Sequence, residues 1–118
     1  MELKAKLNKI VENLEEKKGR DIESVHIGGM TVLADYFVIC SGTSTTHIKA
    51  LADELEVKMA ESGVDLIHKE GYNTARWILL DFDDVIVHIF HDEERKFYNL
   101  ERLWADGAKM YKKQSIDF

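Results

Sequence analysis

The sequence predicts a single α/β domain in which a mixed β-sheet of about four to five strands is flanked by helices. The chain has 118 residues, enough for one hydrophobic core but not for two. Apolar residues recur at helical spacing in some segments and form short alternating or continuous runs in others. Strand-like segments follow one another directly near the start and the end, which favours antiparallel pairs within a mixed sheet over a purely parallel one.

The first half of the chain contains two predicted helices and two predicted strands. Residues 2–18 form an amphipathic helix that ends at Gly19. Residues 24–27 form a short strand, and residues 35–41 form a stronger one whose continuous apolar run fits burial on both faces. The second helix has Ser44 or Thr45 as its N-cap and ends at Gly63.

The second half contains three predicted strands and a last helix. Residues 64–67 form a short edge strand, and residues 76–82 and 85–90 form two longer strands. Asp92 caps a helix that runs in two pieces to about Trp104. The domain therefore spans residues 1–105, and residues 106–118 are a polar C-terminal tail without apolar periodicity.

Strand alternation divides the predicted hairpin around residues 82–85 into two unlike faces. With a loop of two or four residues, Asp81 lies opposite Ile86, Leu79 opposite His88, and Trp77 opposite Phe90. That face mixes large apolar groups with an acid and an imidazole. The other face is nearly pure core and carries Arg76, Ile78, Leu80, Val85, Val87 and Ile89.

The mixed face has two interpretations at this point. It is a recognition surface, because aromatic groups gathered with His, Arg and Asp are typical of interfaces. Alternatively, Trp77 and Phe90 are core under a helix, His88 is a structural histidine, and Asp81 caps the turn. Tyr98, Glu101 and Trp104 recur every third residue, so they can share one side of the last helix and extend the same surface.

Two features suggest catalysis, but their spacing argues against it. Asp81 and Asp83 resemble an acidic pair that holds Mg²⁺, and residues 41–44 resemble a phosphate-binding turn before a helix, as in nucleotidyl transfer. In nucleotidyltransferases the acidic pair follows such a turn closely, whereas here a helix and a loop intervene. The single cysteine, Cys40, lies within an apolar strand and is interpreted as a buried, inert thiol. No zinc framework, dinucleotide motif or P-loop is present, so no metal, cofactor or catalytic residue is expected.

Composition narrows the classes of partner. The formal net charge of −6 argues against nucleic acid as the main partner and is compatible with a basic protein. No apolar run approaches membrane-spanning length, and residues 1–7 lack the apolar core of a secretion signal. We therefore expect a cytoplasmic protein with no membrane association and no direct DNA binding.

The combined motifs resemble the ribosomal silencing factor family, also called Iojap. The resemblance rests on five segments with specific spacing: residues 35–44 followed by His47, residues 70–71, Trp77 with Asp81, residues 84–88, and residues 95–104. It covers nearly the whole chain from the first helix to Trp104. The tail after Trp104 lies outside the family pattern, and Asp83 stands where many members have glycine in the hairpin turn, which suggests a different turn geometry.

The resemblance implies both a fold and a function. The expected fold is similar to that of nucleotidyltransferases but lacks their catalytic motif. The implied partner is the fourteenth protein of the large ribosomal subunit, and its occupation blocks joining of the small subunit and represses translation. The resemblance also implies a homodimer in the free state and a possible part in large-subunit assembly. By position, the family's contact region corresponds to Trp77, Leu79, Asp81, His88, Arg95, Tyr98, Glu101 and Trp104.

Overall fold

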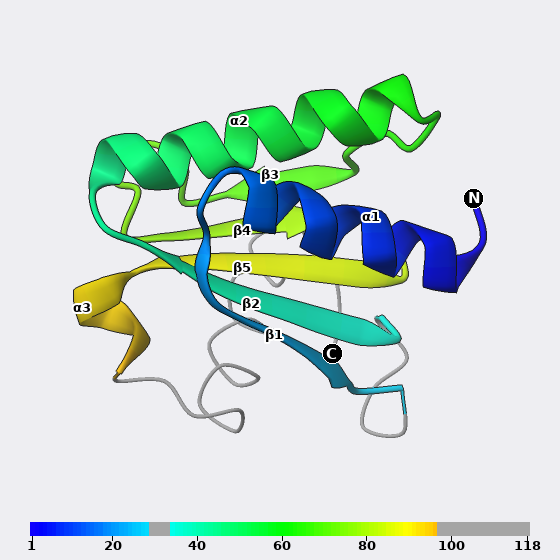
Figure 1. Ribbon diagram of the computed structural model, residues 1–118, viewed down its shortest axis with the longest axis horizontal. Helices are drawn as coiled ribbons and strands as arrows, with labels where there is room; N and C mark the ends of the chain where they lie inside the picture. The colour runs from blue at the N-terminus through cyan, green and yellow to red at the C-terminus, as the bar shows by residue number, and fades with distance from the viewer. Residues whose placement is uncertain (29–33, 97–118) are drawn as a thin grey trace.

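The protein forms a five-stranded mixed sheet with two long helices on one face, as the computed structural model in Figure 1 shows. The structure describes residues 1–28 and 34–96. The elements in chain order are α1 (Leu3–Glu16), β1 (Arg20–His26), β2 (Tyr36–Gly42), α2 (Thr45–Glu61), β3 (His68–Glu70), β4 (Trp77–Asp81), β5 (Val85–His91) and α3 (Asp92–Arg95). The predicted fold class, a mixed α/β sheet flanked by helices, is confirmed.

The strand order β1-β2-β5-β4-β3 places the two longest apolar strands at the centre of the sheet. β2 pairs in parallel with β5, and every other neighbouring pair is antiparallel. A parallel pair requires a crossover, and α2 lies within the connection that runs from β2 to the later strands. Both faces of β2 are buried, as its continuous apolar run predicts.

The predicted hairpin register is confirmed. Trp77 pairs with Phe90, Leu79 with His88, and Asp81 with Ile86 across β4 and β5. The backbone N–H of Phe82 donates to the carbonyl of Val85 over 2.9 Å, which closes a two-residue loop. Within that loop Asp83 has a φ of 80°, the left-handed conformation that glycine adopts most easily. Aspartate therefore occupies this turn without a shift in strand register.

The end of α1 depends on two residues rather than on Gly19 alone. Lys18 takes the left-handed conformation with a φ of 64°, and its N–H donates to the Glu15 carbonyl. Gly19 is required for space, because a Cβ atom there would lie 2.5 Å from Cys40 Sγ. The helix thus ends at Glu16, two residues before the predicted end, and Gly19 is needed for close packing against β2.

The predicted edge strand over residues 64–67 is wrong. Val64 instead closes the C-terminus of α2, where its N–H donates to the Met59 carbonyl and its side chain joins the core. The edge strand is β3, formed by the polar residues that follow. Charged side chains are common on edge strands because they discourage further pairing, so apolar pattern alone misplaced this element.

The predicted N-cap is confirmed for α2 but is wrong by one residue for α3. Ser44 caps α2, and its Oγ accepts from the His47 N–H over 3.1 Å, as predicted. The N-cap of α3 is His91 and not Asp92, because His91 Nδ1 accepts from the Glu93 N–H. Glu93 and Glu94 occupy the first turn of α3, where carboxylates favour the helix dipole. The predicted continuation of this helix to Trp104 and the tail 106–118 lie outside the described residues.

The two faces of the sheet carry separate apolar clusters. One cluster joins α1 and α2 to the sheet through Ile78, Leu80, Val87 and Ile89, all fully buried. We call this side the helix-covered face. The opposite side carries a second cluster and is called the aromatic face; its members are Val25, Ile27, Ala34, Phe37, Ile39, Trp77, Leu79, Ile86 and Phe90. Within residues 1–28 and 34–96, no helix combines the length and apolar character needed to cross a membrane.

Candidate partner-binding site

Trp77 stands at the centre of the candidate site because its indole is half-buried and held in place by ring contacts. The indole stacks on Phe90, with ring centroids 5.1 Å apart and an interplanar angle of 23°. Its Nε1–H donates to His88 Nδ1 over 3.0 Å. An indole with a fixed orientation and a remaining accessible part is the kind of group that anchors protein interfaces.

His88 supports Trp77 by accepting the hydrogen bond from its indole. The imidazole is fully buried, and Phe37 lies edge-on to it with centroids 4.5 Å apart. Burial lowers the pKa of His88 from 6.5 to about 3, so the ring is neutral at physiological pH. Since Nδ1 accepts from Trp77, the proton of the neutral ring resides on Nε2, which has no hydrogen-bond partner among residues 1–28 and 34–96. The expectation that the His88 side chain is hydrogen-bonded is thus confirmed.

Asp81 holds the hairpin turn. Its Oδ1 accepts from the Asp83 N–H over 2.8 Å, and its side chain is largely buried. This contact stabilises the left-handed conformation of Asp83. Leu79, on the same face, is fully buried beneath its neighbours. Asp81 and Leu79 are thus buried residues that support the site rather than form its surface.

Arg95 is the last residue of α3 and connects this helix to two strands. Its Nη1 donates to Ser41 Oγ on β2 over 2.8 Å, and its Nη2 lies 3.4 Å from Glu23 Oε1 on β1. The Arg95 side chain is only 18% exposed. These contacts hold α3 against β1 and β2. Tyr98, Glu101 and Trp104 lie outside the described residues.

The structure separates the two features that suggested nucleotidyl transfer. Ser41 is level with Phe90 on β5, whereas Asp81 is level with Ile86. Positions 90 and 86 are four residues apart, which is about 13 Å along a strand. The turn at residues 41–44 and the acidic pair thus lie at opposite ends of the sheet. Among residues 1–28 and 34–96, no group of three or more His, Cys, Asp or Glu side chains is placed to hold a metal ion.

Cys40 is a buried, inert thiol, as predicted. Its side chain is fully buried, and burial raises the pKa of the thiol to about 12, against the opposing charge of Arg95. A thiol with such a pKa stays protonated at neutral pH and is a poor nucleophile.

Sequence reasoning missed Phe37 as a member of this site. Phe37 lies on β2, forty residues before Trp77, and reaches His88 only because β2 pairs in parallel with β5. Its apolar character indicated a buried strand, but no local pattern specifies which strand it pairs with. The hydrogen bond from Arg95 to Ser41 depends on the same parallel pairing.

Comparisons with known proteins identify the family of the chain. The family model described as "Ribosomal silencing factor during starvation" matches residues 1–117. A ribosomal silencing factor of Halalkalibacterium halodurans is 41% identical over 97 residues, which cover 82% of this chain and 83% of the relative. A more distant mouse protein, named mitochondrial assembly of ribosomal large subunit protein 1, is 33% identical over 84% of this chain and 45% of its own length.

Solved structures support the same assignment. A crystal structure of a protein from Chromobacterium violaceum superimposes with a TM-score of 0.83 and 35% identity, covering 89% of this chain and 88% of that chain. The resemblance noted from sequence motifs is therefore confirmed. The family model extends to residue 117, so the expectation that the tail after Trp104 lies outside the family pattern is wrong. This protein belongs to the ribosomal silencing factor family.

Proposed function

We propose that this protein represses translation by binding the large ribosomal subunit through its fourteenth protein and sterically blocking the small subunit. The observation that carries the proposal is the family match over residues 1–117. The mechanism requires no chemistry, no cofactor and no metal ion. It requires a surface with a few well-ordered anchors, and the aromatic face offers the half-buried Trp77 indole in that role.

The predicted site residues divide into contacts and supports under this proposal. Trp77 is proposed as a contact among the described members, because it is only partly buried. Leu79 and His88 act as supports, since both are fully buried. Asp81 stabilises the hairpin turn, and Arg95 holds α3 in place through its bonds to β1 and β2. Tyr98, Glu101 and Trp104 are proposed as further contacts.

Charge supports a basic partner. The chain carries 22 acidic and 16 basic residues, and ribosomal proteins that bind RNA are generally basic. Opposite charge speeds the encounter of two proteins, whereas the buried anchors determine how long the complex lasts. From the family membership together with the net charge, we also propose a cytoplasmic protein that is homodimeric when free and does not bind DNA or membranes.

Sedimentation of purified ribosomal subunits tests the proposal. An excess of the protein added before the subunits are mixed should reduce the fraction of joined ribosomes in a sucrose gradient and should itself migrate with the large subunit. Addition of the protein after joining serves as the control, because the docking surface is then covered. If excess protein leaves joining unchanged in both orders of addition, the proposal fails.

A second candidate is a factor that shields an immature large subunit during assembly. The printed name of the mouse relative favours it. Depletion of this protein should then lead to accumulation of large-subunit precursors during rapid growth, when silencing is not needed. Unchanged precursor levels on depletion would leave only the silencing role.

A nucleotidyltransferase activity that uses Asp81 and Asp83 is the third candidate, and the geometry favours it least. Asp81 Oδ1 is engaged by the Asp83 N–H, and the turn at residues 41–44 lies at the far end of the sheet. Calorimetry with Mg²⁺ and a nucleoside triphosphate should therefore give no heat of binding. A signal that disappears in Asp81→Asn would favour the enzyme instead.

A further inference from the structure

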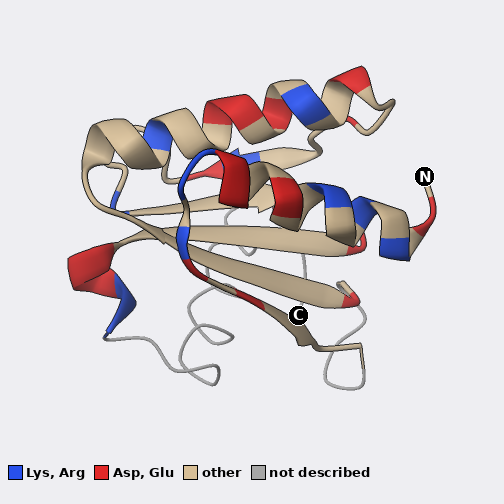
Figure 2. Ribbon diagram, in the orientation of Figure 1, with Lys and Arg blue, Asp and Glu red and all other residues tan. Residues whose placement is uncertain are grey.

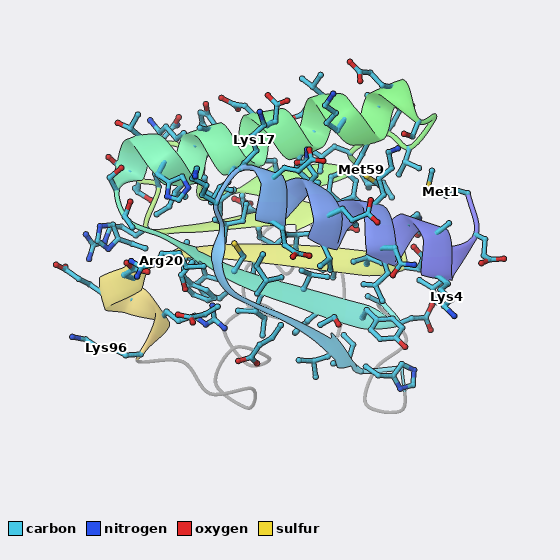
Figure 3. All side chains as sticks on the ribbon, in the orientation of Figure 1. Met1, Lys4, Lys17, Arg20, Met59 and Lys96 are labelled. Carbon is cyan, nitrogen blue, oxygen red and sulfur yellow. The ribbon has the colours of Figure 1, made fainter. Side chains whose placement is uncertain are left out.

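A hollow on the helix side of the molecule is lined by three cationic side chains. It has a volume of about 550 Å³, and its lining residues are Lys17, Lys18, Arg20, Thr43 and His47. Lys17 and Lys18 lie on the short segment that joins α1 to β1, and Arg20 is the first residue of β1. Figure 3 shows Lys17 and Arg20 near this junction, whereas Lys4 lies near the other end of α1. Such a concentration of positive charge is unexpected in a chain with a net charge of −6.

His47 fixes the two walls of the hollow relative to each other. Its Nδ1 accepts from the Thr43 N–H over 3.1 Å, so its Nε2–H is the donor to the Lys17 carbonyl, also over 3.1 Å. The segment that bears the cations is thereby tied to the turn before α2. Because this bridge uses both ring nitrogens, His47 positions the walls and leaves ligand contacts to the lysines and the arginine.

The cations are available to a ligand. Lys18 is exposed, and its side chain makes no hydrogen bond or ion pair with residues 1–28 or 34–96. Lys17 lies 3.8 Å from Glu54, and Arg20 lies 3.2 Å from Asp92, with the two basic side chains 46% and 58% exposed. Exposed ion pairs of this kind contribute little, so a more highly charged anion can displace the carboxylates.

The start of α2 adds to the positive potential of the hollow. The first turn of this 17-residue helix contains no acidic residue, in contrast to the three in α3. Figure 2 shows the first turns of α2 without Asp or Glu, close to the basic segment after α1. Ser44 accepts from His47 and Ile48, while the helix itself provides no partner for the amides of Thr45 and Thr46. Amides and a helix dipole in this position favour an anion.

We propose that this hollow, the basic hollow, binds a phosphate group. The donors match phosphate oxygens, which accept several charge-assisted hydrogen bonds at once. Apart from the engaged imidazole, the lining contains no aromatic ring on which a base could stack, so recognition is of the phosphate and not of the base. The phosphate can come from a free phosphorylated molecule or from the backbone of RNA. This proposal is independent of the ribosomal function, because the basic hollow and the aromatic face belong to different clusters of residues.

The test uses the full chain, two probes and two matched variants. Amide resonances are followed by NMR during titration with inorganic phosphate, against sodium chloride at equal ionic strength, and separately with a short RNA of mixed sequence. Lys18→Glu reverses a charge in the basic hollow, and Lys4→Glu makes the same change on an exposed lysine outside it. Both variants are checked for wild-type chemical shifts elsewhere in the fold.

We expect saturable shifts at the amides around residues 17–20 and 43–47, with affinity lowered about tenfold in Lys18→Glu and unchanged in Lys4→Glu. If the protein binds inorganic phosphate and binds RNA no more tightly, the source of the phosphate group is a free ligand. Tighter RNA binding, whose salt slope falls by about one in Lys18→Glu, identifies the RNA backbone. The proposal is overturned if neither probe gives saturable shifts, or if Lys4→Glu weakens binding as much as Lys18→Glu.

Discussion

The helix-covered face and the aromatic face are built from the same strands but differ in chemistry. Alternate residues of β4 and β5 place Ile78, Leu80, Val87 and Ile89 under α1 and α2, and these four side chains are aliphatic and fully buried. The intervening residues place an indole, an imidazole and a carboxylate on the other side, each with a specific hydrogen bond. The helix-covered face stabilises the fold through apolar burial. The aromatic face orients polar and aromatic groups, and burying its polar atoms costs some stability.

Because of this difference, a mutation can change either the stability of the fold or the affinity for a partner, depending on the face that it alters. A substitution on the helix-covered face should lower the free energy of unfolding and leave the intrinsic affinity for a partner unchanged. A substitution at Trp77 should lower affinity more than stability. The experiments below test that separation, beginning with the largest expected effect.

Leu80→Ala should destabilise the protein by about 3 kcal/mol, because Leu80 is fully buried under the helices and its loss leaves a cavity. Urea unfolding followed by circular dichroism measures the change. The affinity of the remaining folded protein for the large subunit should equal that of the wild type. A loss of affinity in the folded fraction would show that the two faces are coupled.

Trp77→Ala should weaken binding to the large subunit by about 2 kcal/mol or more, since it removes the proposed anchor of the aromatic face. Fluorescence anisotropy of labelled protein with purified large subunits measures the affinity. Val57→Ala is the matched control, because Val57 is an apolar side chain that is 52% exposed on α2, which covers the opposite face of the sheet. Wild-type affinity in Trp77→Ala, with the fold intact by circular dichroism, would exclude Trp77 as an anchor.

His88 should make stability depend on pH in acid. Its folded pKa of about 3 lies below the ordinary value of 6.5, so between these values the unfolded state binds more protons and stability falls as pH falls. The contribution should approach 1.4 kcal/mol per pH unit within that window and vanish above pH about 6.5. Urea unfolding at a series of pH values should show the slope in the wild type and in His26→Gln, an exposed histidine, but a reduced slope in His88→Gln. An equal slope in His88→Gln would contradict the burial argument.

Asp81→Asn should change stability by less than about 0.5 kcal/mol, because the amide oxygen can still accept from the Asp83 N–H, whereas Asp81→Ala should cost about 1 kcal/mol. Thermal unfolding of the two variants compares them directly. Equal losses in both would mean that the negative charge, and not the hydrogen bond, accounts for the role of Asp81 in the turn.

Local patterns in the sequence determined much of this structure. The period-2 alternation of the hairpin was sufficient to predict its register and to divide its faces, because a one-residue slip would expose the core. Helical periodicity located α1 and α2, and the hydroxyl of Ser44 marked the start of α2. These features depend on neighbours within a few residues, so they are readable without knowledge of the fold. Spaced motifs also identified the family, and the comparisons confirmed it.

Tertiary structure alone decided which distant residues meet. Parallel pairing of β2 with β5 brings Phe37 to His88 and Ser41 to Arg95, and it holds the turn at residues 41–44 away from Asp81. The basic hollow likewise exists only because His47 joins two segments thirty residues apart. Such contacts depend on how the strands are ordered in the sheet and on which side chains fill the space between elements. A sequence pattern records which side of each element is buried, but the partner across the interface is selected by the packing of the whole chain.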